Sequence, residues 1–251
     1  MAEVALKVAG LTKRFGGLVV SNGLDLEINE GETHAVIGPN GAGKTTLINQ
    51  IQGELRPDGG RIVFRGKDIS NESAPRRARL GIARTYQITS IFPEFPVITN
   101  VALARQVSSG HSFRFLRGAV TDRTLIEPAR EMVTRVGLEG RARDLAQDLS
   151  HGEMRQLEIA MALATQPSLL LLDEPMAGMG GQDSARMKRL LAEIKRTCTI
   201  LLVEHDMDAV FSLADRITVL VSGRNIATGD PDGIRADRRV RDAYLGHPGG
   251  A

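Results

Sequence analysis

The sequence predicts an α/β protein whose main sheet is mostly parallel and carries helices on both faces. Three observations lead to this prediction. Short apolar runs alternate with helical patterns after residue 165, a glycine-rich phosphate-binding motif stands between a strand and a helix, and alternating side chains near the N-terminus indicate a separate antiparallel layer. With 251 residues, 42% of them hydrophobic, the chain can form one large core with at most a modest appended lobe.

The antiparallel layer is predicted from residues 4–30, where apolar and polar side chains alternate in two runs around Gly16-Gly17. The second run gives a strand over residues 23–28, and residues 61–64 give a further strand before a turn. Because this alternation is typical of a sheet with one covered face, we expect these strands to lie beside the main sheet.

A phosphate-binding loop is predicted at residues 38–45, which fit the pattern G-x-x-x-x-G-K-[ST]. A buried strand over residues 33–37 precedes it and a helix over residues 46–51 follows. Glycines let successive backbone N–H groups surround an anion, and the helix adds the positive end of its dipole. A glycine-rich turn that merely contains a lysine explains this order poorly. The expected nucleotide-binding residues are Gly38, Pro39, Asn40, Gly41, Ala42, Gly43, Lys44, Thr45 and Thr46.

Residues 100–164 carry a helical pattern, which predicts a helical lobe interrupted by a long polar loop over residues 105–125. That loop is a surface excursion or, alternatively, a contact for a partner. Beyond the lobe, strands alternate with helices, as in a mostly parallel sheet. The expected strands are 169–172, 199–203 and 216–221, and the expected helices are 184–194 and 207–213.

Asp173 and Glu174 directly follow the tetra-leucine strand. An acid at the end of a buried strand, in a sheet that also carries a phosphate loop, is placed to hold Mg²⁺, and the Thr45 hydroxyl is its expected partner. Glu174 is expected to activate a water molecule for attack on the γ-phosphate of ATP. Consecutive residues in extended backbone point to opposite sides, which would separate the two carboxylates.

Two more side chains are expected at the phosphates. Lys44 should reach the β- and γ-phosphates. His205 ends the next strand of the same sheet, so we assign it to the γ-phosphate and the attacking water, although a lone histidine is more often structural. Gln87 carries no specific signal of its own.

Composition limits the class of protein. The net charge is only +2, so a general nucleic-acid-binding surface is not indicated, and the arginine-rich stretches 76–79 and 235–241 are expected to be solvated faces, with acidic partners or lipid headgroups as the alternative. The single cysteine, Cys198, excludes an intrachain disulfide and is expected to be packed and unreactive. Without a signal peptide or an 18-residue apolar run, any membrane association is expected to come through partners.

In order along the chain, the phosphate loop, Gln87, the segment Leu149–Glu153, Asp173-Glu174 and His205 resemble the nucleotide-binding subunit of ATP-binding cassette (ABC) transporters. We call Leu149–Glu153 the signature segment. The resemblance covers nearly the full length of this chain. It implies a single ABC ATPase domain over 1–251, with a P-loop NTPase (RecA-like) core and an antiparallel β layer in 1–87 and 165–251, and a helical lobe in 88–164.

The resemblance also implies roles for individual residues. Phe15 matches the aromatic residue that stacks on adenine, Gln87 helps Thr45 to position Mg²⁺, Glu174 is the catalytic carboxylate and His205 contacts the γ-phosphate. Catalysis would therefore involve Glu174, His205 and Gln87, and the metal would be held by Thr45, Gln87 and Asp173.

The same resemblance implies a head-to-tail dimer in which Ser150 and Gly152 contact the ATP bound by the opposite subunit, either a second copy or a sibling ATPase. The signature usually reads Leu-Ser-Gly-Gly-Gln, so Glu153 stands where an amide is common, and the family's Asp after the catalytic acid is missing from 176–179. Phe15 replaces a frequent tyrosine, and the ring is still expected to stack.

The segments 13–18, 105–125, 177–179 and 244–246 resemble the ATPases of branched-chain amino-acid uptake systems and their urea and amide relatives. This implies an importer ATPase at the cytoplasmic face of the cell membrane. Integral membrane permease subunits would be its direct partners, an extracytoplasmic solute-binding protein an indirect one, and nucleic acid none. Two alternatives are a soluble cassette ATPase acting on a macromolecule, and a GTP-dependent switch or small-molecule kinase.

Overall fold

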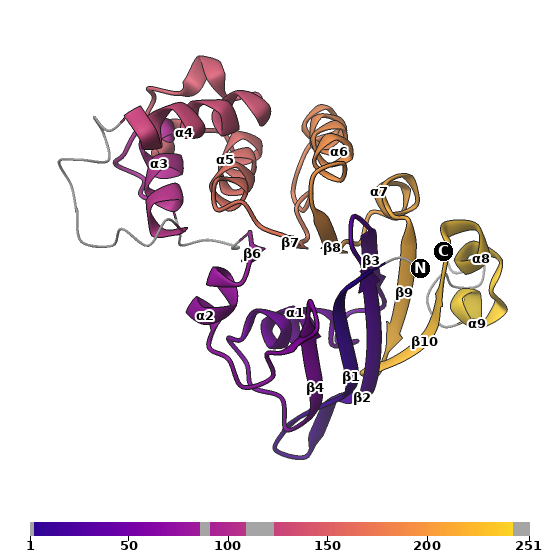
Figure 1. The fold of residues 1–251 in the computed structure, drawn as a ribbon. Coiled ribbons are helices and arrows are strands. Elements are labelled where there is room, and N and C mark those ends of the chain that lie inside the picture. The colour runs from indigo at the N-terminus through magenta and orange to yellow at the C-terminus, as the bar shows by residue number, and fades with distance from the viewer. Residues whose placement is uncertain (1–2, 86–90, 109–122, 243–251) are drawn as a thin grey trace.

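A computed structural model describes residues 3–85, 91–108 and 123–242. Its smaller sheet is antiparallel, with strand order β2-β1-β4-β5, and Figure 1 shows β1, β2 and β4 side by side. The strands are β1 (Val4–Phe15), β2 (Leu18–Asn29), β4 (Gly59–Phe64) and β5 (Lys67–Asp68). The predicted pair of strands around Gly16-Gly17 is confirmed, because β1 and β2 form a hairpin that turns there.

The larger sheet has six strands in the order β10-β9-β3-β8-β7-β6, and only β10 runs antiparallel to its neighbour. Its strands are β3 (Thr33–Ile37), β6 (Ile82–Arg84), β7 (Leu169–Asp173), β8 (Thr199–Val203), β9 (Arg216–Val221) and β10 (Arg224–Gly229). The expected parallel core is confirmed. The sequence did not predict the three-residue β6 or the polar β10, because neither has a long apolar run.

The helices cover both faces of this sheet. They are α1 (Lys44–Gln52), α2 (Ala74–Arg79), α3 (Val97–Ser108), α4 (Arg123–Arg135), α5 (His151–Ala164), α6 (Gly181–Ile194), α7 (Met207–Leu213), α8 (Pro231–Ala236) and α9 (Arg238–Val240), with short 3₁₀ turns at Glu139–Arg141 and Ala146–Asp148. Figure 1 shows α3, α4 and α5 gathered into one lobe. The loop expected over 105–125 is wrong at both ends, which are helical, and residues 109–122 lie outside the described chain.

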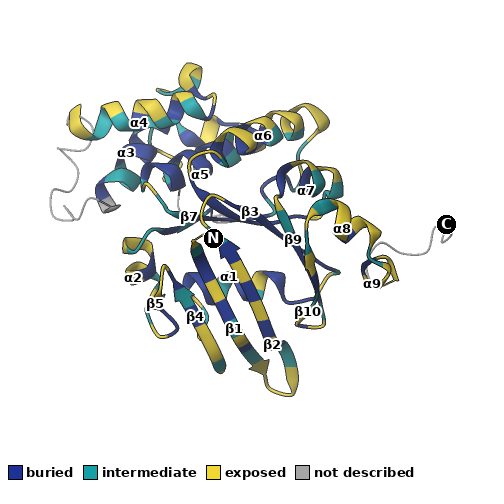
Figure 2. Ribbon diagram, turned by 45° about the vertical axis from the view of Figure 1, so that its right-hand side comes forward, coloured by how far each residue is buried: buried dark blue, intermediate teal, exposed yellow. Residues whose placement is uncertain are grey.

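The four leucines of β7 explain how the layers are joined. Leu169 and Leu171 pack with α1 and the antiparallel sheet, whereas Leu170 and Leu172 pack with the helices on the other face. Alternate side chains of a strand point to opposite faces, so a strand buried on both sides needs an unbroken apolar run. Figure 2 shows β3 and β7 as buried strands between α5 and α6 on one side and β1, β2 and β4 on the other.

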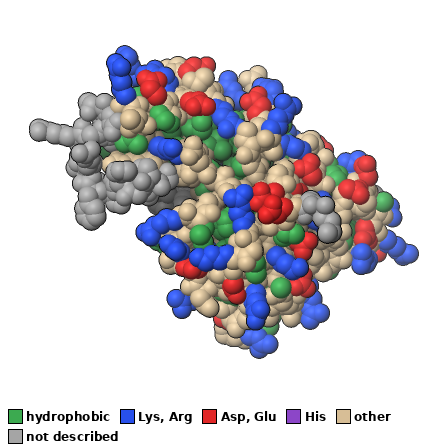
Figure 3. Space-filling model, viewed as in Figure 1, with side chains coloured by type: hydrophobic (Ala, Val, Ile, Leu, Met, Phe, Trp, Pro, Cys, Tyr) green, Lys and Arg blue, Asp and Glu red, His purple; other side chains and the backbone are tan. Residues whose placement is uncertain are grey.

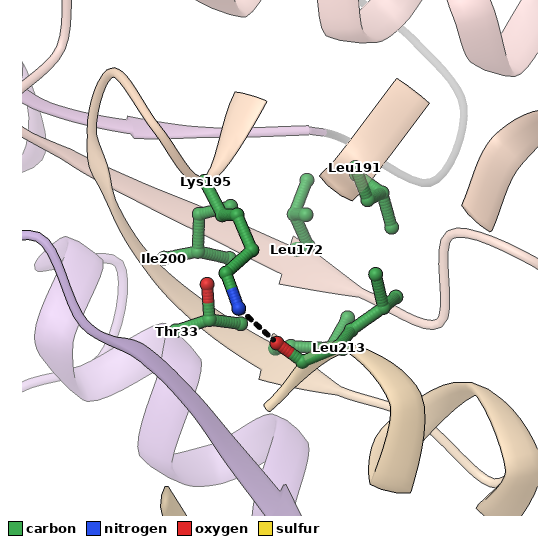
Figure 4. Close-up of a pocket in the computed structure, with 7 residues that line it drawn as sticks. Thr33, Leu172, Leu191, Lys195, Ile200 and Leu213 are labelled. Carbon is green, nitrogen blue, oxygen red and sulfur yellow. Dashed lines mark hydrogen bonds between the residues drawn. The ribbon is translucent and has the colours of Figure 1, made fainter. Parts of the chain in front are cut away.

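The helix-covered face of the sheet leaves no room for a ligand between α6, α7 and β8. Leu172, Leu191 and Ile200 line a gap there that is too small to hold a water molecule (Figure 4). The Lys195 ammonium closes it by donating a hydrogen bond to the Leu213 carbonyl oxygen at 3.2 Å.

Charge is distributed as the small net charge suggests. Figure 3 shows Lys and Arg side chains interspersed with Asp and Glu over the face in view. Arg76 and Arg79 are exposed, as expected for a solvated face, but Arg77 between them is only 1% exposed, which corrects the expectation for that residue. Cys198 is packed as expected, and burial raises the pKa of its thiol to about 11.

Candidate functional site

The phosphate loop connects β3 to α1, and two of its glycines are required by its surroundings. Gly43 has φ +101°, and a Cβ there would lie 2.7 Å from the Val20 carbonyl oxygen of β2. A Cβ on Gly38 would collide with the Leu220 carbonyl oxygen of β9. The loop is thus pressed between two strands, and only glycine allows the backbone to pass. Because the loop is so closely packed, its backbone N–H groups rather than its side chains are available to surround an anion.

Helix α1 begins at Lys44, directly after the loop, with no side-chain cap at Gly43. The N–H groups of its first turn, at Lys44, Thr45 and Thr46, have no acceptor within the helix, and together with the helix dipole they favour an anion. The Lys44 ammonium lies over the loop, donating to the carbonyl oxygens of Gly38 at 2.7 Å and Pro39 at 3.1 Å. Burial lowers the pKa of Lys44, and the nearby carboxylates of Glu174 and Asp173 oppose that shift.

Asp173 ends β7 and is buried. One carboxylate oxygen, Oδ2, accepts a hydrogen bond from Arg84 at 2.9 Å, while Oδ1 is buried and has no hydrogen-bond partner among the described residues. Burial raises the pKa of Asp173, against the effect of the Arg84 guanidinium. An unpartnered buried carboxylate oxygen fits a hard cation such as Mg²⁺, which prefers oxygen ligands.

The sequence predicted that extended backbone continues through Glu174, and this prediction is wrong. The Glu174 φ of +50° lies in the left-handed region, so the two carboxylates are separated by a turn rather than by extended backbone. The Glu174 N–H still pairs with the Val203 carbonyl oxygen at 2.8 Å, and its own carbonyl accepts from Ala177. The turn brings Glu174 Oε1 to 2.8 Å from His205 Nε2, with both side chains partly exposed to solvent.

Glu204 is a site residue that the sequence analysis missed. It is 3% exposed, and its two carboxylate oxygens accept from the Met176 N–H at 2.9 Å and the His205 N–H at 2.8 Å. It therefore fastens the turn after β7 to the turn after β8, which carry Glu174 and His205. The only sequence signal was an acid next to an apolar strand, and the site role was assigned instead to His205, the residue that follows.

The signature segment forms the start of α5. The Ser150 hydroxyl accepts from the Glu153 N–H at 3.3 Å, and the Glu153 carboxylate accepts from the Ser150 N–H at 2.8 Å, a reciprocal capping box. The Ser150 N–H holds the pKa of Glu153 below its usual value. Gly152 is buried, and a Cβ there would lie 3.1 Å from Asp183 Cγ. The acid in place of the usual amide thus has a structural role as the N3 residue of the helix.

Phe15 lies at the end of β1, 50% exposed, with the Lys13 ammonium 5.6 Å from its ring centre. This exposed ring is on the hairpin whose second strand contacts the phosphate loop at Val20. Gln87 lies outside the described residues. Four of the predicted residues, Lys44, Asp173, Glu174 and His205, meet at one edge of the larger sheet, and we call this set the phosphate edge.

Comparisons with known proteins agree with this geometry. A family model described as "ABC transporter" matches residues 21–177, and one described as "Branched-chain amino acid ATP-binding cassette transporter" matches residues 224–249. The high-affinity branched-chain amino acid transport ATP-binding protein LivG of Salmonella typhimurium is 39% identical over 98% of this chain and 99% of its own. BraF of Pseudomonas aeruginosa, described in the same words, is 37% identical over the same shares.

A solved ATP-binding cassette of an ABC transporter, in its ADP conformation, superposes with a TM-score of 0.86 at 30% sequence identity, covering 97% of this chain and 99% of the other. The fold inferred from the resemblance, a nucleotide-binding core with an antiparallel layer and a helical lobe, is thereby confirmed, as is the branched-chain amino-acid subfamily. Among the described residues, no helix is long and apolar enough to cross a membrane. The chain belongs to the ATP-binding cassette proteins of ABC transporters, in the branch that contains the branched-chain amino-acid transport ATPases.

Proposed function

We propose that this chain hydrolyses ATP to power the import of a branched-chain amino acid, or a similar small polar solute, through partner permease subunits. The observation that carries the proposal is the phosphate edge, where Lys44, Asp173, Glu174 and His205 converge from three segments: the start of α1, the end of β7 and the end of β8. LivG and BraF, which are similar over nearly their whole lengths, are named as branched-chain amino acid transport ATP-binding proteins.

The phosphates of ATP would lie on the N–H groups of the loop and of α1, with Lys44 supplying a point charge. Mg²⁺, when bound, neutralises phosphate charge, and the residues that would hold it are Asp173, Thr45 and Gln87. Glu174 accepts the proton of the attacking water, and the products are ADP and phosphate. His205 holds the Glu174 carboxylate through the 2.8 Å contact, and it would reach the γ-phosphate.

We also propose that the active unit is a dimer with a second copy or a sibling ATPase. Among the described residues, Ser150 and Glu153 hydrogen-bond to each other, and Glu153 also forms an ion pair with Arg141, within the region 88–164 that we take as the helical lobe. Ser150 and Gly152 would then complete the site of the opposite subunit, and Phe15 would stack on adenine in its own. The permease subunits place the dimer at the cytoplasmic face of the membrane.

The test is solute uptake by a reconstituted complex. The chain is purified with candidate permease subunits, placed in lipid vesicles containing ATP, and supplied with the matching binding protein and labelled leucine or valine. We expect uptake that stops when Glu174 is replaced by glutamine. Uptake of urea or ribose in preference to leucine would overturn the solute assignment, and ATP hydrolysis stimulated by nucleic acid rather than by a permease would overturn the transport assignment.

A further inference from the structure

Arg84, the last residue of β6, occupies the space between the end of α1 and the end of β7. Its side chain is only 8% exposed. One terminal nitrogen, Nη1, donates to Asn49 Oδ1 at 2.7 Å, Gln52 Oε1 at 2.9 Å and Glu54 Oε2 at 3.2 Å. The other, Nη2, donates to Asp173 Oδ2 at 2.9 Å. A single planar guanidinium therefore joins α1 to β7.

The contact with Asp173 is one-sided. Arg84 engages Oδ2 only, and Oδ1 is the oxygen left buried without a partner among the described residues. An arginine often grips a carboxylate through both oxygens, which would occupy the whole group. Here the other terminal nitrogen, Nη1, donates to acceptors in α1 and just beyond its C-terminal end, and the Asp173 carboxylate is held by Arg84 at one oxygen and open at the other.

We propose that Arg84 is a positioning residue for the metal-binding carboxylate: it fixes the plane of Asp173 so that Oδ1 is presented to the magnesium of Mg·ATP. The inference rests on the proposed function, because it needs a nucleotide and a metal at the phosphate edge. α1 begins at Lys44, with Thr45 as its second residue, and β7 ends at Asp173. Arg84 thus fixes the spacing between the two elements that carry Thr45 and Asp173, two of the expected metal ligands.

The shape of the side chain matters as well as its charge. A lysine at residue 84 would keep one positive charge, but an ammonium cannot reproduce the planar fork that spans Asn49 and Asp173. The other nearby cation, Lys44, donates to the carbonyl oxygens of Gly38 and Pro39 and is expected on the phosphates. Partners that orient metal ligands from behind typically change metal affinity by about 10- to 100-fold when removed.

Arg77 provides a matched control. It is also buried, and its guanidinium donates to the carbonyl oxygens of Gln50 at 2.6 Å and Ile51 at 2.7 Å in the last turn of α1. It holds the same end of the helix as Arg84 does, but its remaining hydrogen bonds go to the carbonyl oxygens of Glu72 and Ser70 rather than to a carboxylate. Arg77→Lys therefore disturbs α1 without touching Asp173.

The experiment measures how much a divalent cation tightens nucleotide binding. Affinity for the ATP analogue AMP-PNP is determined by titration in Mg²⁺ and in EDTA for the wild type, Arg84→Gln, Arg84→Lys and Arg77→Lys, and Mn²⁺ binding with AMP-PNP is followed by paramagnetic resonance. We expect both Arg84 variants to lose about tenfold or more of the Mg²⁺-dependent tightening. Their affinity in EDTA should stay within about twofold of the wild type, and Arg77→Lys should retain the tightening.

Each outcome decides the matter. Full tightening in Arg84→Lys or Arg84→Gln overturns the positioning role, and so does an equal loss in Arg77→Lys, because Arg84 would then act only through the packing of α1. If Arg84→Gln does not fold, Arg84→Lys decides alone, with thermal unfolding as its folding check. A wild type that binds no nucleotide in either buffer contradicts the proposed function itself, which separates the two failures.

Discussion

The phosphate edge and the signature segment are built in opposite ways. The phosphate edge gathers residues separated by up to 161 positions, from Lys44 to His205, and their contacts cross from one segment of the sheet to another. The signature segment is local: Ser150 and Glu153 cap their own helix within three residues. The first therefore depends on the whole fold, whereas the second depends on one helix terminus.

This contrast indicates how the two regions divide the work. The phosphate edge contains a lysine, two acids and a histidine, which within one chain can supply a cation for the phosphates, oxygens for a metal and a base for the attacking water. The signature segment carries a serine and an exposed helix start but no acid or base aimed at a reacting group. Its chemistry suits a contact that is completed by a ligand from outside, such as the ATP of a partner. Substitutions should therefore separate nucleotide binding within one chain from contact between chains.

The largest expected effect comes from Glu174→Gln. An amide keeps the size of the side chain but cannot accept the proton of the attacking water, so steady-state hydrolysis should fall by about 10²- to 10⁴-fold. Nucleotide affinity should change little, because the loop, α1 and Lys44 are untouched. Phosphate release and nucleotide titration measure the two quantities. A variant that hydrolyses ATP at the wild-type rate would remove Glu174 from the catalytic role.

Ser150→Arg should reduce hydrolysis by about 10²-fold, comparable to the loss of one donor at a transition-state oxyanion. The affinity of the monomer for ATP should remain within about twofold, because the signature segment is not part of the chain's own phosphate edge. Asp230→Ala is a matched control. Asp230 caps α8 by accepting from the Gly233 N–H at 2.8 Å, so this substitution also removes a helix cap. Equal losses of hydrolysis and monomer affinity in Ser150→Arg would contradict the division between the two regions.

Lys44→Ala should weaken ATP binding by about 10- to 100-fold, because a hydrogen bond to a charged group contributes about 1.5–3 kcal/mol. Calorimetric titration in Mg²⁺ gives the affinity. Arg65→Ala is a suitable control, since it removes a cation that is paired with Glu30 at 2.7 Å on the surface. Unchanged affinity in Lys44→Ala would place the phosphates elsewhere.

Sequence reasoning succeeded where a pattern has a direct physical cause. The tetra-leucine run marked a strand buried on both faces, and Gly38 and Gly43 marked a loop pressed against β9 and β2. It failed where the contacts are between segments far apart in the chain. Arg84 carries no local signal, and Glu204 shows only an acid beside an apolar strand, because Asp173 and Met176 become their neighbours only when β6, β7 and β8 pair.

The turn at Glu174 shows a second limit. Its φ of +50° is unusual for a residue other than glycine, and a glutamate at that position does not predict it. The backbone is held there by the Val203 carbonyl oxygen and by Glu204 through Met176. The sequence therefore predicted which residues would meet at the sheet edge, but not the geometry by which Glu174 reaches His205.

The smallest expected effect is that of Glu153→Gln, which tests the local half of the comparison. The glutamine keeps an oxygen for the Ser150 N–H but loses the charge near the N-terminus of α5, so unfolding free energy should fall by only about 0.3–1 kcal/mol. Because the folded pKa of Glu153 lies below its usual value, the wild type has this stability above the ordinary glutamate pKa and loses it as pH falls through the folded pKa. Denaturant unfolding between pH 7 and the acid range should therefore show the difference between wild type and Glu153→Gln shrinking as pH falls. A difference that grew on acidification would mean that the carboxylate does not cap this helix, and the signature segment would then need support from beyond its own few residues.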